Sequence, residues 1–399
     1  MRFATACVLL CLAAFQFVDA LPRWPGLGKG LPGDWWRPLP VVIWHGLGDS
    51  AQSPWLRNLK GQLEHMYPGI YVHLVEVQEG ALVDQRATVF GNVNAQIDAV
   101  RDQLLSVPEL RRGFDAVGFS QGGQFLRGFT ERYNTPPVRN LVTFGSQHMG
   151  ITDLPLCAKW DVVCRSVHSL LSGGVYTDYA QENVVVAQYF RDVRTVDTFE
   201  RYKKKSHFLH DINNEAHEKN EEYKRNMRRL NKFVMVQFDN DKTVVPAASS
   251  WFSTFSDPDP RDDSAPNATV PLRQSRLYTE DWLGLRAIDR RGGLVFQQCH
   301  GTHMSLDAEC LTLTFGQYVG RPRLPGRWSA VASGVQTRED ARYHHGHHNL
   351  RCASRLLYGL YIFLVFGAVV LAIRRYRRRG EQSPVCLAEA ECGKEVLAR

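Results

Sequence analysis

Short, nearly continuous apolar runs alternate along this chain with segments in which apolar residues recur every three or four positions. The helical periodicity is clearest from Asn92 to Leu105, and helix-compatible residues also run from Gln121 to Tyr133. The apolar runs predict buried strands at Val41 to Trp44, Tyr71 to Val77, Phe114 to Phe119, Leu141 to Phe144, Lys232 to Phe238 and Gly293 to Gln298. Strands that alternate with helices predict an α/β fold with a mostly parallel central sheet.

The pattern changes in residues 157–230, which are mixed, mostly polar and poor in strand signals. We interpret this segment as a helical insertion, or lid, within a catalytic domain that spans residues 38–320. Residues 21–37 are rich in Gly, Pro and Trp and predict an irregular lead-in. Parallel sheets bind their ligands beyond the carboxyl ends of the strands, so we expect the functional residues on the loops at that edge.

Both ends of the chain carry apolar segments with their own signatures. Residues 1–20 contain Arg2, an apolar stretch and a small-x-small ending, which predicts a cleaved secretory signal; an uncleaved anchor is the alternative. Residues 356–373 form an uncharged apolar run that predicts a single transmembrane helix, and a glycolipid-anchor signal is the competing interpretation. The dense arginines in residues 374–399 predict a basic cytosolic tail, and residues 321–355 a His-rich stalk.

The composition is that of an ordinary globular protein, with 44% apolar and 22% charged residues. The net charge of +7 comes largely from the arginines that flank residues 356–373, so we predict no nucleic-acid partner. We interpret the histidines of residues 343–348 as part of a solvated linker and predict no metal site. No phosphate-binding glycine motif occurs between a strand and a helix, and no cofactor is expected.

Four cysteines lie in the predicted catalytic domain: Cys157, Cys164, Cys299 and Cys310. They are compatible with two disulfides in an oxidising compartment, most economically between the two sequence-near pairs, although the sequence allows three connectivities. Cys352 has no assigned role. Asn267 begins an Asn-Ala-Thr sequon, which predicts N-glycosylation in the secretory pathway.

The strongest chemical signal is the sequence Gly118-Phe119-Ser120-Gln121-Gly122 between a predicted strand and a predicted helix. A G-x-S-x-G motif in this context is the nucleophile elbow, a tight turn that exposes the serine hydroxyl. We therefore predict that Ser120 is a catalytic nucleophile.

A nucleophilic serine needs a histidine base and a carboxylate that orients it, and in this fold they follow in the order Ser, Asp or Glu, His. Asp241 and His303 each follow a predicted strand, so both should lie at the same edge of the sheet as Ser120. Asp239 and His300 are rivals that spacing alone does not exclude. We interpret His148 as a residue that lines the site or serves the structure.

Acyl transfer also requires donors to the oxyanion that forms on the attacked carbonyl. The amide of Gln121, directly after the nucleophile, is one candidate. The other is the amide of Leu47, in the glycine-containing loop His45 to Ser50 after an early strand. A glycine-rich turn without a catalytic role is the alternative for that loop.

Beyond the elbow, ordered blocks from about Pro38 to about Tyr318 resemble the lysosomal palmitoyl-protein thioesterases. They are Val42 to Ser50, Pro68 to Val72, Asn92 to Gln96, Gly118 to Arg127, Gly145 to Gly150, Lys232 to Val236, Trp251-Phe252 and Leu277 to Leu285. The resemblance implies an α/β-hydrolase fold and an enzyme that removes long-chain acyl groups from the cysteines of lipidated proteins. Such an enzyme would act on S-acylated proteins in the lysosome, with its catalytic domain lumenal.

Carried over by motif, the resemblance assigns the nucleophile to Ser120, the aspartate to Asp241 and the histidine to His303. It places the oxyanion amides at Leu47 and Gln121, and it matches Cys157 and Cys164 to a family cysteine pair. The chain also departs from the family pattern. Ala51 and Gln52 stand where the family has adjacent cysteines, and Cys299, Cys310 and the transmembrane run have no familiar counterpart.

Two other functions are compatible with the same residues. One is an acyl-CoA thioesterase or an oxygen-ester lipase, which keeps the mechanism and changes the bond. The other is a non-catalytic lipid-binding membrane protein on a hydrolase scaffold, against which the complete Ser120, Asp241 and His303 set argues. The sequence does not indicate an oligomeric state.

Overall fold

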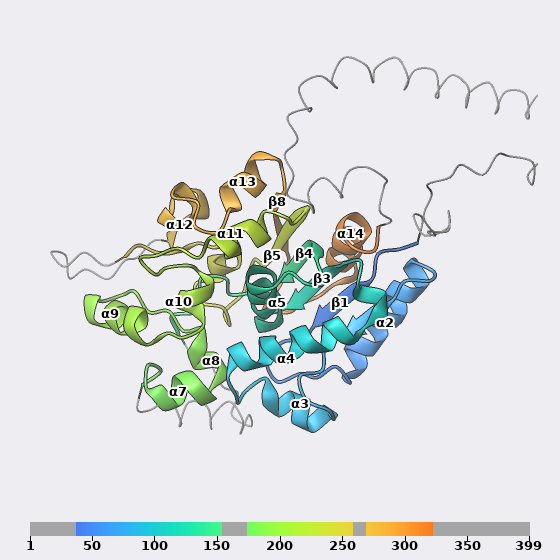
Figure 1. The fold of residues 1–399 in the computed structure, drawn as a ribbon, viewed down its shortest axis with the longest axis horizontal. Helices are drawn as coiled ribbons and strands as arrows, with labels where there is room; N and C mark the ends of the chain where they lie inside the picture. Colours follow the sequence, from blue (N-terminus) through green and yellow to red (C-terminus); the bar gives the residue numbers. More distant parts are fainter. Residues whose placement is uncertain (1–36, 154–173, 258–268, 322–399) are drawn as a thin grey trace, which may run out of the picture. The chain divides into compact units, whose positions relative to one another are not determined.

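The computed structural model describes residues 37–153, 174–257 and 269–321, all within one compact unit of the chain (Figure 1). Several predictions fall outside these residues: the signal at 1–20, the lead-in before residue 37, Cys157, Cys164, Asn267, the stalk beyond residue 321, the apolar run 356–373 and the tail 374–399. Within the described ranges, no helix has the length and apolar character needed to cross a membrane.

The predicted parallel sheet is confirmed. It has six strands in the order β2-β1-β3-β4-β5-β8, and every neighbouring pair is parallel. The strands are β1 (Val41–Trp44), β2 (Val72–Leu74), β3 (Phe114–Phe119), β4 (Val138–Phe144), β5 (Lys232–Phe238) and β8 (Leu294–Cys299). Because most of their residues are buried, these strands have the near-continuous apolar sequence of a sheet covered on both faces.

The second strand is shorter than the predicted range Tyr71 to Val77. The Val75 amide still donates to the Ile43 carbonyl at 2.8 Å, but the Val77 amide donates to the Asp84 carboxylate at 2.8 Å. A side chain therefore takes over the backbone hydrogen bond that would have extended the strand. A separate antiparallel pair, β6 (Thr254–Phe255) and β7 (Thr269–Val270), was not predicted.

Helices cover both faces of the sheet, and alternate strand residues contribute to two hydrophobic clusters. Val42, Ala116 and Leu141 pack with residues of α4 (Val93–Ser106) and α5 (Gln121–Arg132). Their neighbours Ile43, Val117 and Val142 pack on the other side with α2 (Pro54–Met66) and α14 (Ala308–Tyr318). The alternation follows from the two-residue period of strand side chains.

The described part of the predicted insertion, residues 174–230, is helical. Its helices gather at one side of the molecule (Figure 1) and are α7 (Asp178–Asn183), α8 (Val185–Gln188), α9 (Val196–Lys205), α10 (Leu209–Ile212) and α11 (Glu221–Met227). The other helices in the described residues are α3 (Ala81–Ala87), α12 (Arg276–Thr279) and α13 (Leu285–Arg290), with the short 3₁₀ segments η2 (Pro108–Leu110), η4 (Ala247–Trp251) and η5 (Leu272–Gln274).

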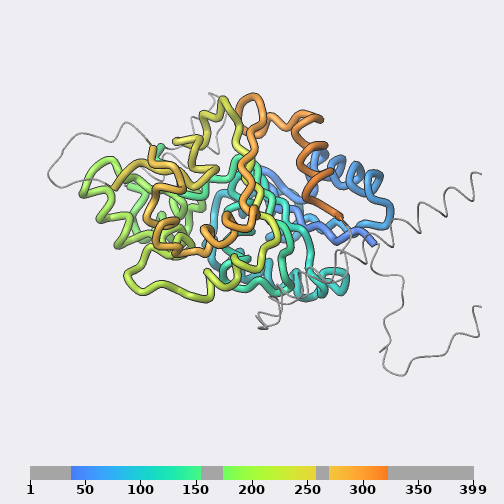
Figure 2. The backbone as a smooth tube through the Cα atoms, turned by 90° about the horizontal axis from the view of Figure 1, so that it is seen from above, coloured from blue at the N-terminus to red at the C-terminus, as the bar shows by residue number. Residues whose placement is uncertain are grey.

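The two ends of the described chain meet. Figure 2 shows α14, in orange, beside α2, in blue, which is the first helix of the described residues. The Tyr67 hydroxyl donates to the Phe315 carbonyl at 3.1 Å. The last helix is thereby held against the first part of the fold.

The strand order reverses direction between β1 and β3. The chain runs outward from β1 to β2, crosses over β1 to reach β3, and then continues outward in the other direction through β4 and β5 to β8. In open parallel sheets, ligands bind in the crevice at such a switch point, outside the carboxyl ends of the strands. The loop after β1 and the residue after β3 therefore mark the expected site.

Candidate active site

Ser120 lies at this switch point, on a strained turn between β3 and α5. Its φ of 52° and ψ of −125° are unusual for a residue other than glycine. The Ser120 amide donates to the Phe144 carbonyl at 2.8 Å, which ties the turn to β4. Backbone strain of this kind at a strand-to-helix turn is the geometry of a nucleophile elbow.

The glycines of the motif allow α5 to begin close to the sheet. A Cβ atom on Gly118 would lie 2.1 Å from the Gly123 Cα atom. A Cβ atom on Gly122 would lie 2.4 Å from the Trp44 carbonyl oxygen. Neither position has room for a side chain, so close packing explains why glycine stands at both.

Ser120, His303 and Asp241 form a continuous hydrogen-bonded chain. The His303 ring lies 3.0 Å from the Ser120 Oγ atom through Nε2 and 2.7 Å from Asp241 Oδ2 through Nδ1. The other carboxylate oxygen of Asp241 accepts from the amides of Thr243 at 2.9 Å and Val244 at 3.0 Å. The aspartate is thus fixed by its own loop, and it orients the histidine toward the serine.

The rival residues lie elsewhere. His300 and Asp239 form a separate pair, with Nδ1 and Oδ2 2.7 Å apart, and the His300 side chain is 91% exposed. His148 is buried, stacks on Phe252 and lies 3.0 Å from the Thr143 hydroxyl through Nε2. Burial lowers the pKa of His148, which favours a neutral structural side chain.

The two candidate oxyanion amides flank the serine. Leu47 follows Gly46, at which a Cβ atom would lie 3.2 Å from the Ser120 Cβ atom, and Gln121 directly follows the serine. Among the residues that the structure describes, neither the Leu47 amide nor the Gln121 amide has a hydrogen-bond partner. Unpaired amides in the two segments that adjoin the serine are candidates for binding an oxyanion.

The loop after β1 is anchored by a buried pair that the sequence did not reveal. His45 Nε2 lies 3.0 Å from Asp84 Oδ2, and Asp84 also accepts from the amides of Ala51 at 2.9 Å and Val77 at 2.8 Å. Burial alone would raise the pKa of Asp84, but the hydrogen bond and charge of His45 and the two amides lower it. Asp84 therefore holds the start of the loop His45 to Ser50 as an ionised group.

A mostly apolar cavity of about 500 Å³ opens beside the serine. Its lining consists of Gly46, Leu47, Asp49, Trp55, Phe119, Ser120, Gln147, Ile151, Tyr189, Thr243, Val244, His303, Met304 and Leu306. Its size is in the range of small-molecule sites. Tyr189 comes from the insertion, so this segment contributes to the wall of the site as well as to its surroundings. No sequence signal singled out Tyr189, because it lies in a segment without periodicity.

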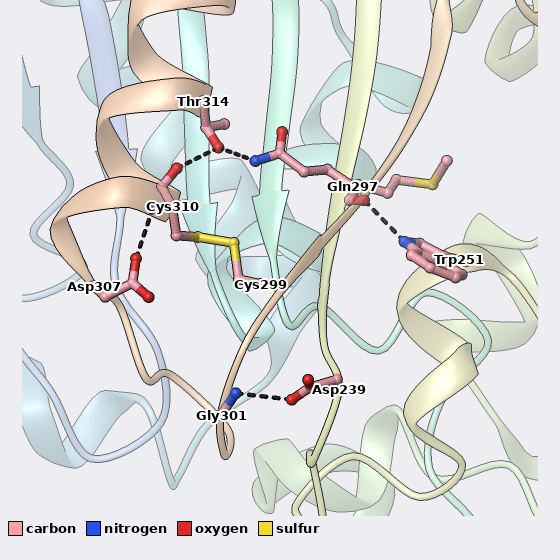
Figure 3. Close-up of a disulfide and its surroundings, with 9 residues drawn as sticks. Asp239, Trp251, Gln297, Cys299, Gly301, Asp307, Cys310 and Thr314 are labelled. Carbon is pink, nitrogen blue, oxygen red and sulfur yellow. Dashed lines mark hydrogen bonds between the residues drawn. A yellow bond between two sulfur atoms is a disulfide. The ribbon is translucent and has the colours of Figure 1, made fainter.

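A disulfide joins Cys299 and Cys310 at the two ends of the loop that carries His303 (Figure 3). Cys299 ends β8, and Cys310 lies in the first turn of α14, where its amide donates to the Asp307 carboxylate at 2.6 Å. Within the loop, the Gly301 amide donates to Asp239 at 2.8 Å. The His303 loop is therefore tied to both flanking elements and to the loop after β5.

The sheet is parallel, and the serine on its strained elbow is hydrogen-bonded to a histidine that pairs with an aspartate, beside an apolar cavity. Together these features define a hydrolase of the α/β class. The comparison with known families specifies it further. A family described as palmitoyl protein thioesterase matches residues 40–303, and the chain belongs to the palmitoyl-protein thioesterase family.

Individual proteins with thioesterase names are also similar to this chain. Palmitoyl-protein thioesterase 1 of Caenorhabditis elegans is 37% identical over 276 residues, covering 69% of this chain and 89% of the relative. Palmitoyl-protein thioesterase 3 of Dictyostelium discoideum is 35% identical, with 66% and 84% covered. The lysosomal thioesterase PPT2 homolog of Drosophila melanogaster is 28% identical, with 64% and 82% covered. The solved structure of RedJ with a PEG molecule bound in the active site matches 76% of this chain and 98% of its own, with 14% identity and a TM-score of 0.36.

Proposed function

We propose that this protein hydrolyses long-chain fatty acyl thioesters on protein cysteines, with Ser120 as nucleophile, His303 as general base and Asp241 as the residue that orients the base. The observation that carries the proposal is the hydrogen-bonded chain from Asp241 through His303 to Ser120 at the wall of an apolar cavity. The proposal rests equally on membership of the family.

In the first step, the Ser120 hydroxyl attacks the thioester carbonyl carbon while His303 Nε2 takes the hydroxyl proton. The carbonyl π electrons move to oxygen, and the amides of Leu47 and Gln121 stabilise the oxyanion. When the intermediate collapses, the carbon–sulfur bond breaks and the cysteine sulfur leaves with the proton from His303. An acyl-Ser120 ester and a free cysteine thiol remain.

In the second step, a water molecule gives a proton to His303 and attacks the acyl-Ser120 carbonyl. The same two amides stabilise the second oxyanion, and collapse returns the proton to Ser120 as the fatty acid leaves. Throughout both steps Asp241 accepts from Nδ1, which keeps Nε2 directed at the serine. This carboxylate also stabilises the positive charge that His303 carries in each intermediate.

The cavity is suited to an acyl chain. Trp55, Phe119, Ile151, Val244 and Leu306 contribute apolar walls beside the serine. Each methylene that leaves water for this environment contributes about 0.8 kcal/mol of binding free energy.

The charge of the lining favours a protein thioester over acyl-CoA. Within the described residues, the lining has one carboxylate, Asp49, and neither lysine nor arginine. The phosphates of a coenzyme A leaving group are best bound by lysine or arginine, and this lining supplies neither. A cysteine in a peptide carries no such requirement.

Labelling with an acyl fluorophosphonate and turnover of a palmitoyl-cysteine peptide test the proposal on the full chain. We expect wild-type protein to be labelled and to release palmitate, and Ser120→Ala to do neither while unfolding at the same temperature. Matched palmitoyl-CoA and palmitoyl oxygen-ester substrates should turn over more slowly. Labelling with faster oxygen-ester turnover would move the protein to the lipases, and a folded, unlabelled protein would overturn the proposal.

We also propose that the catalytic domain, residues 38–320, lies in the lumen of the secretory pathway, in the lysosome. The signal pattern at 1–20, the sequon at Asn267, the Cys299–Cys310 disulfide and the name of the Drosophila relative support this location. The apolar run 356–373 would then be the single membrane anchor. Deletion of 356–373 should release active protein into the medium, and Asn267→Gln should abolish the mobility shift caused by peptide N-glycosidase.

A further inference from the structure

The two proposed oxyanion amides belong to different elements, and their relative position determines whether they can bind one oxygen atom. Leu47 lies in the loop after β1, whereas Gln121 begins α5 after β3. Donors of this kind stabilise the transition state when they lie about 3 Å from the developing oxyanion. A displacement of either amide by about 1 Å therefore lowers the reaction rate strongly. Some contact must therefore hold the loop and the helix in register.

On the loop side, Thr88 provides the contact. The Gly46 carbonyl accepts from the Asp49 amide at 3.4 Å, and Gly48 has a φ of +74°, the positive value that a type II turn needs at its third residue. The Gly48 amide donates to the Thr88 hydroxyl at 2.8 Å, which fixes the central peptide of this turn. Because the Gly46–Leu47 peptide is trans, the Leu47 N–H points away from the Gly46 carbonyl and out of the turn.

The direction of the Thr88 hydroxyl is also determined. A hydroxyl has one proton, and that of Thr88 is donated to the Gln85 carbonyl at 2.6 Å, which leaves oxygen lone pairs free to accept from Gly48. The Gln85 side chain in turn donates to the Gly48 carbonyl at 2.6 Å. Gly48 is thus held through both its amide and its carbonyl by the end of α3.

On the helix side, the same residue holds Gln121. The Gln121 side-chain amide donates to the Thr88 carbonyl at 3.0 Å, and its Oε1 atom accepts from the Tyr189 hydroxyl at 3.1 Å. Thr88, Gln121 and Tyr189 are all buried. The first residue of α5 therefore has its side chain fixed from two directions.

We propose that Thr88 is a positioning residue that aligns the two oxyanion amides, through its hydroxyl for the Leu47 loop and through its carbonyl for Gln121. This inference rests on the proposed function for the roles of Leu47 and Gln121. Thr88 does not line the cavity, so it acts on the transition state through the two amides and leaves the binding of the acyl chain unchanged.

The test compares Thr88→Val, which keeps the shape of the side chain and removes the hydroxyl, with Thr88→Ser, which keeps the hydroxyl. For both variants and wild type, we would measure kcat and KM for a palmitoyl-cysteine peptide, the rate constant of fluorophosphonate labelling of Ser120, and the unfolding temperature. We expect Thr88→Val to lower kcat and the labelling rate by about 10- to 100-fold with KM changed less than about twofold. Thr88→Ser should stay within about threefold of wild type in every measurement.

Each result bears on the two proposals separately. A folded Thr88→Val variant with wild-type kcat and labelling rate would overturn the role of Thr88 and leave the thioesterase function intact. Equal losses in Thr88→Val and Thr88→Ser, or a loss confined to KM, would also overturn it. If wild type is labelled but does not cleave the thioester, the proposed substrate is wrong, and the labelling rates still decide the role of Thr88. A folded wild type that is not labelled would overturn both.

Discussion

Asp239 and Asp241 lie two residues apart in the loop after β5, yet their carboxylates accept hydrogen bonds from different histidines. Asp241 pairs with His303, which reaches Ser120, whereas Asp239 pairs with the exposed His300. Both distances are 2.7 Å, so hydrogen-bond length alone does not separate the two pairs. Their surroundings do, since the Asp241 side chain is fully buried and the Asp239 side chain is 34% exposed.

The contrast between the two histidines gives a matched pair of variants. His303→Gln removes the group placed to take the Ser120 proton, and we expect kcat to fall by about 10⁴-fold or more. His300→Gln removes one half of an exposed pair, and we expect kcat within about fivefold of wild type. Thioester turnover at equal protein concentration measures both. Comparable losses in the two variants would contradict the assignment of the base to His303.

The exposed pair of His300 and Asp239 should stabilise the fold only in a limited pH window. The hydrogen bond from His300 lowers the pKa of Asp239 below its ordinary 3.8, and the hydrogen bond to Asp239 raises the pKa of His300 above its ordinary 6.5. The Asp239 contribution is present above 3.8 and disappears as the pH falls through the lowered pKa. The His300 contribution is complete below 6.5 and disappears as the pH rises through the raised pKa. Both are present between about 3.8 and 6.5.

Unfolding temperatures of wild type and His300→Gln, measured from acid to alkaline pH, test this window. The difference between them should be largest near pH 5 and should shrink on the alkaline side as His300 becomes neutral. High salt should reduce it in the pH range where both groups are charged, because the pair is exposed. A difference that does not change with pH would show that the two residues do not interact as charges.

Gly145 leaves room for the His303 ring. A Cβ atom there would lie 3.0 Å from His303 Cε1 and 3.1 Å from Phe238 Cε2, and the φ of Gly145 is +57°. Gly292 has a similar φ of +69°, but no atom lies within 4 Å of its added Cβ. Gly145→Ala and Gly292→Ala should therefore share a backbone penalty of about 1–2 kcal/mol, the cost of a left-handed conformation for a residue with a Cβ atom. We expect only Gly145→Ala to lower kcat, by about tenfold or more, because only there is the histidine displaced.

Kinetics and chemical denaturation of the two glycine variants separate strain from displacement. Similar losses of unfolding free energy with unequal kcat values would support the displacement of His303. If Gly292→Ala lost as much activity, general destabilisation would explain both variants.

Loss of the Cys299–Cys310 disulfide should affect stability and catalysis together. The two cysteines are 11 residues apart, and cross-links that close short loops typically contribute about 2–4 kcal/mol to the free energy of unfolding. The double variant Cys299→Ala, Cys310→Ala should lose about this amount. Because the closed loop carries His303, kcat should fall in the same variant at temperatures where it is still folded.

Reduction of the wild type provides the control for that variant. Mild reductant should lower its kcat and unfolding temperature toward the values of the double variant and leave the double variant unchanged. Full activity in a folded double variant would show that the His303 loop keeps its place without the cross-link.

The sheet could be predicted from the sequence because its strands are local, apolar runs, and the elbow because its motif is contiguous. The choice between His303 and His300 could not be made from spacing. Each lies 61 or 62 residues from its aspartate, and both follow the same strand. The resemblance to a family made that choice, and the structure brings the same residues together.

The supporting contacts had no sequence signal at all. Asp84, Thr88 and Tyr189 lie in segments without apolar periodicity. Each contacts a residue beside the site, His45, Gly48 and Gln121 respectively, only once the strands and helices have packed together. Apart from local contacts such as those to the Val77 amide and the Gln85 carbonyl, their partners lie 33 to 68 residues away. Polar contacts across such separations depend on the completed fold, so a local pattern cannot reveal them.

The position of β8 at the sheet edge and at the end of the domain has a consequence for biosynthesis. A nascent chain that has emerged only as far as β5 already contains Ser120 and can form the elbow, but His303 is still to be translated. The proposed nucleophile thus exists for a time without its base. On the proposed mechanism, the base arrives with one of the last segments of the domain to leave the ribosome, after the rest of the sheet is available to receive it.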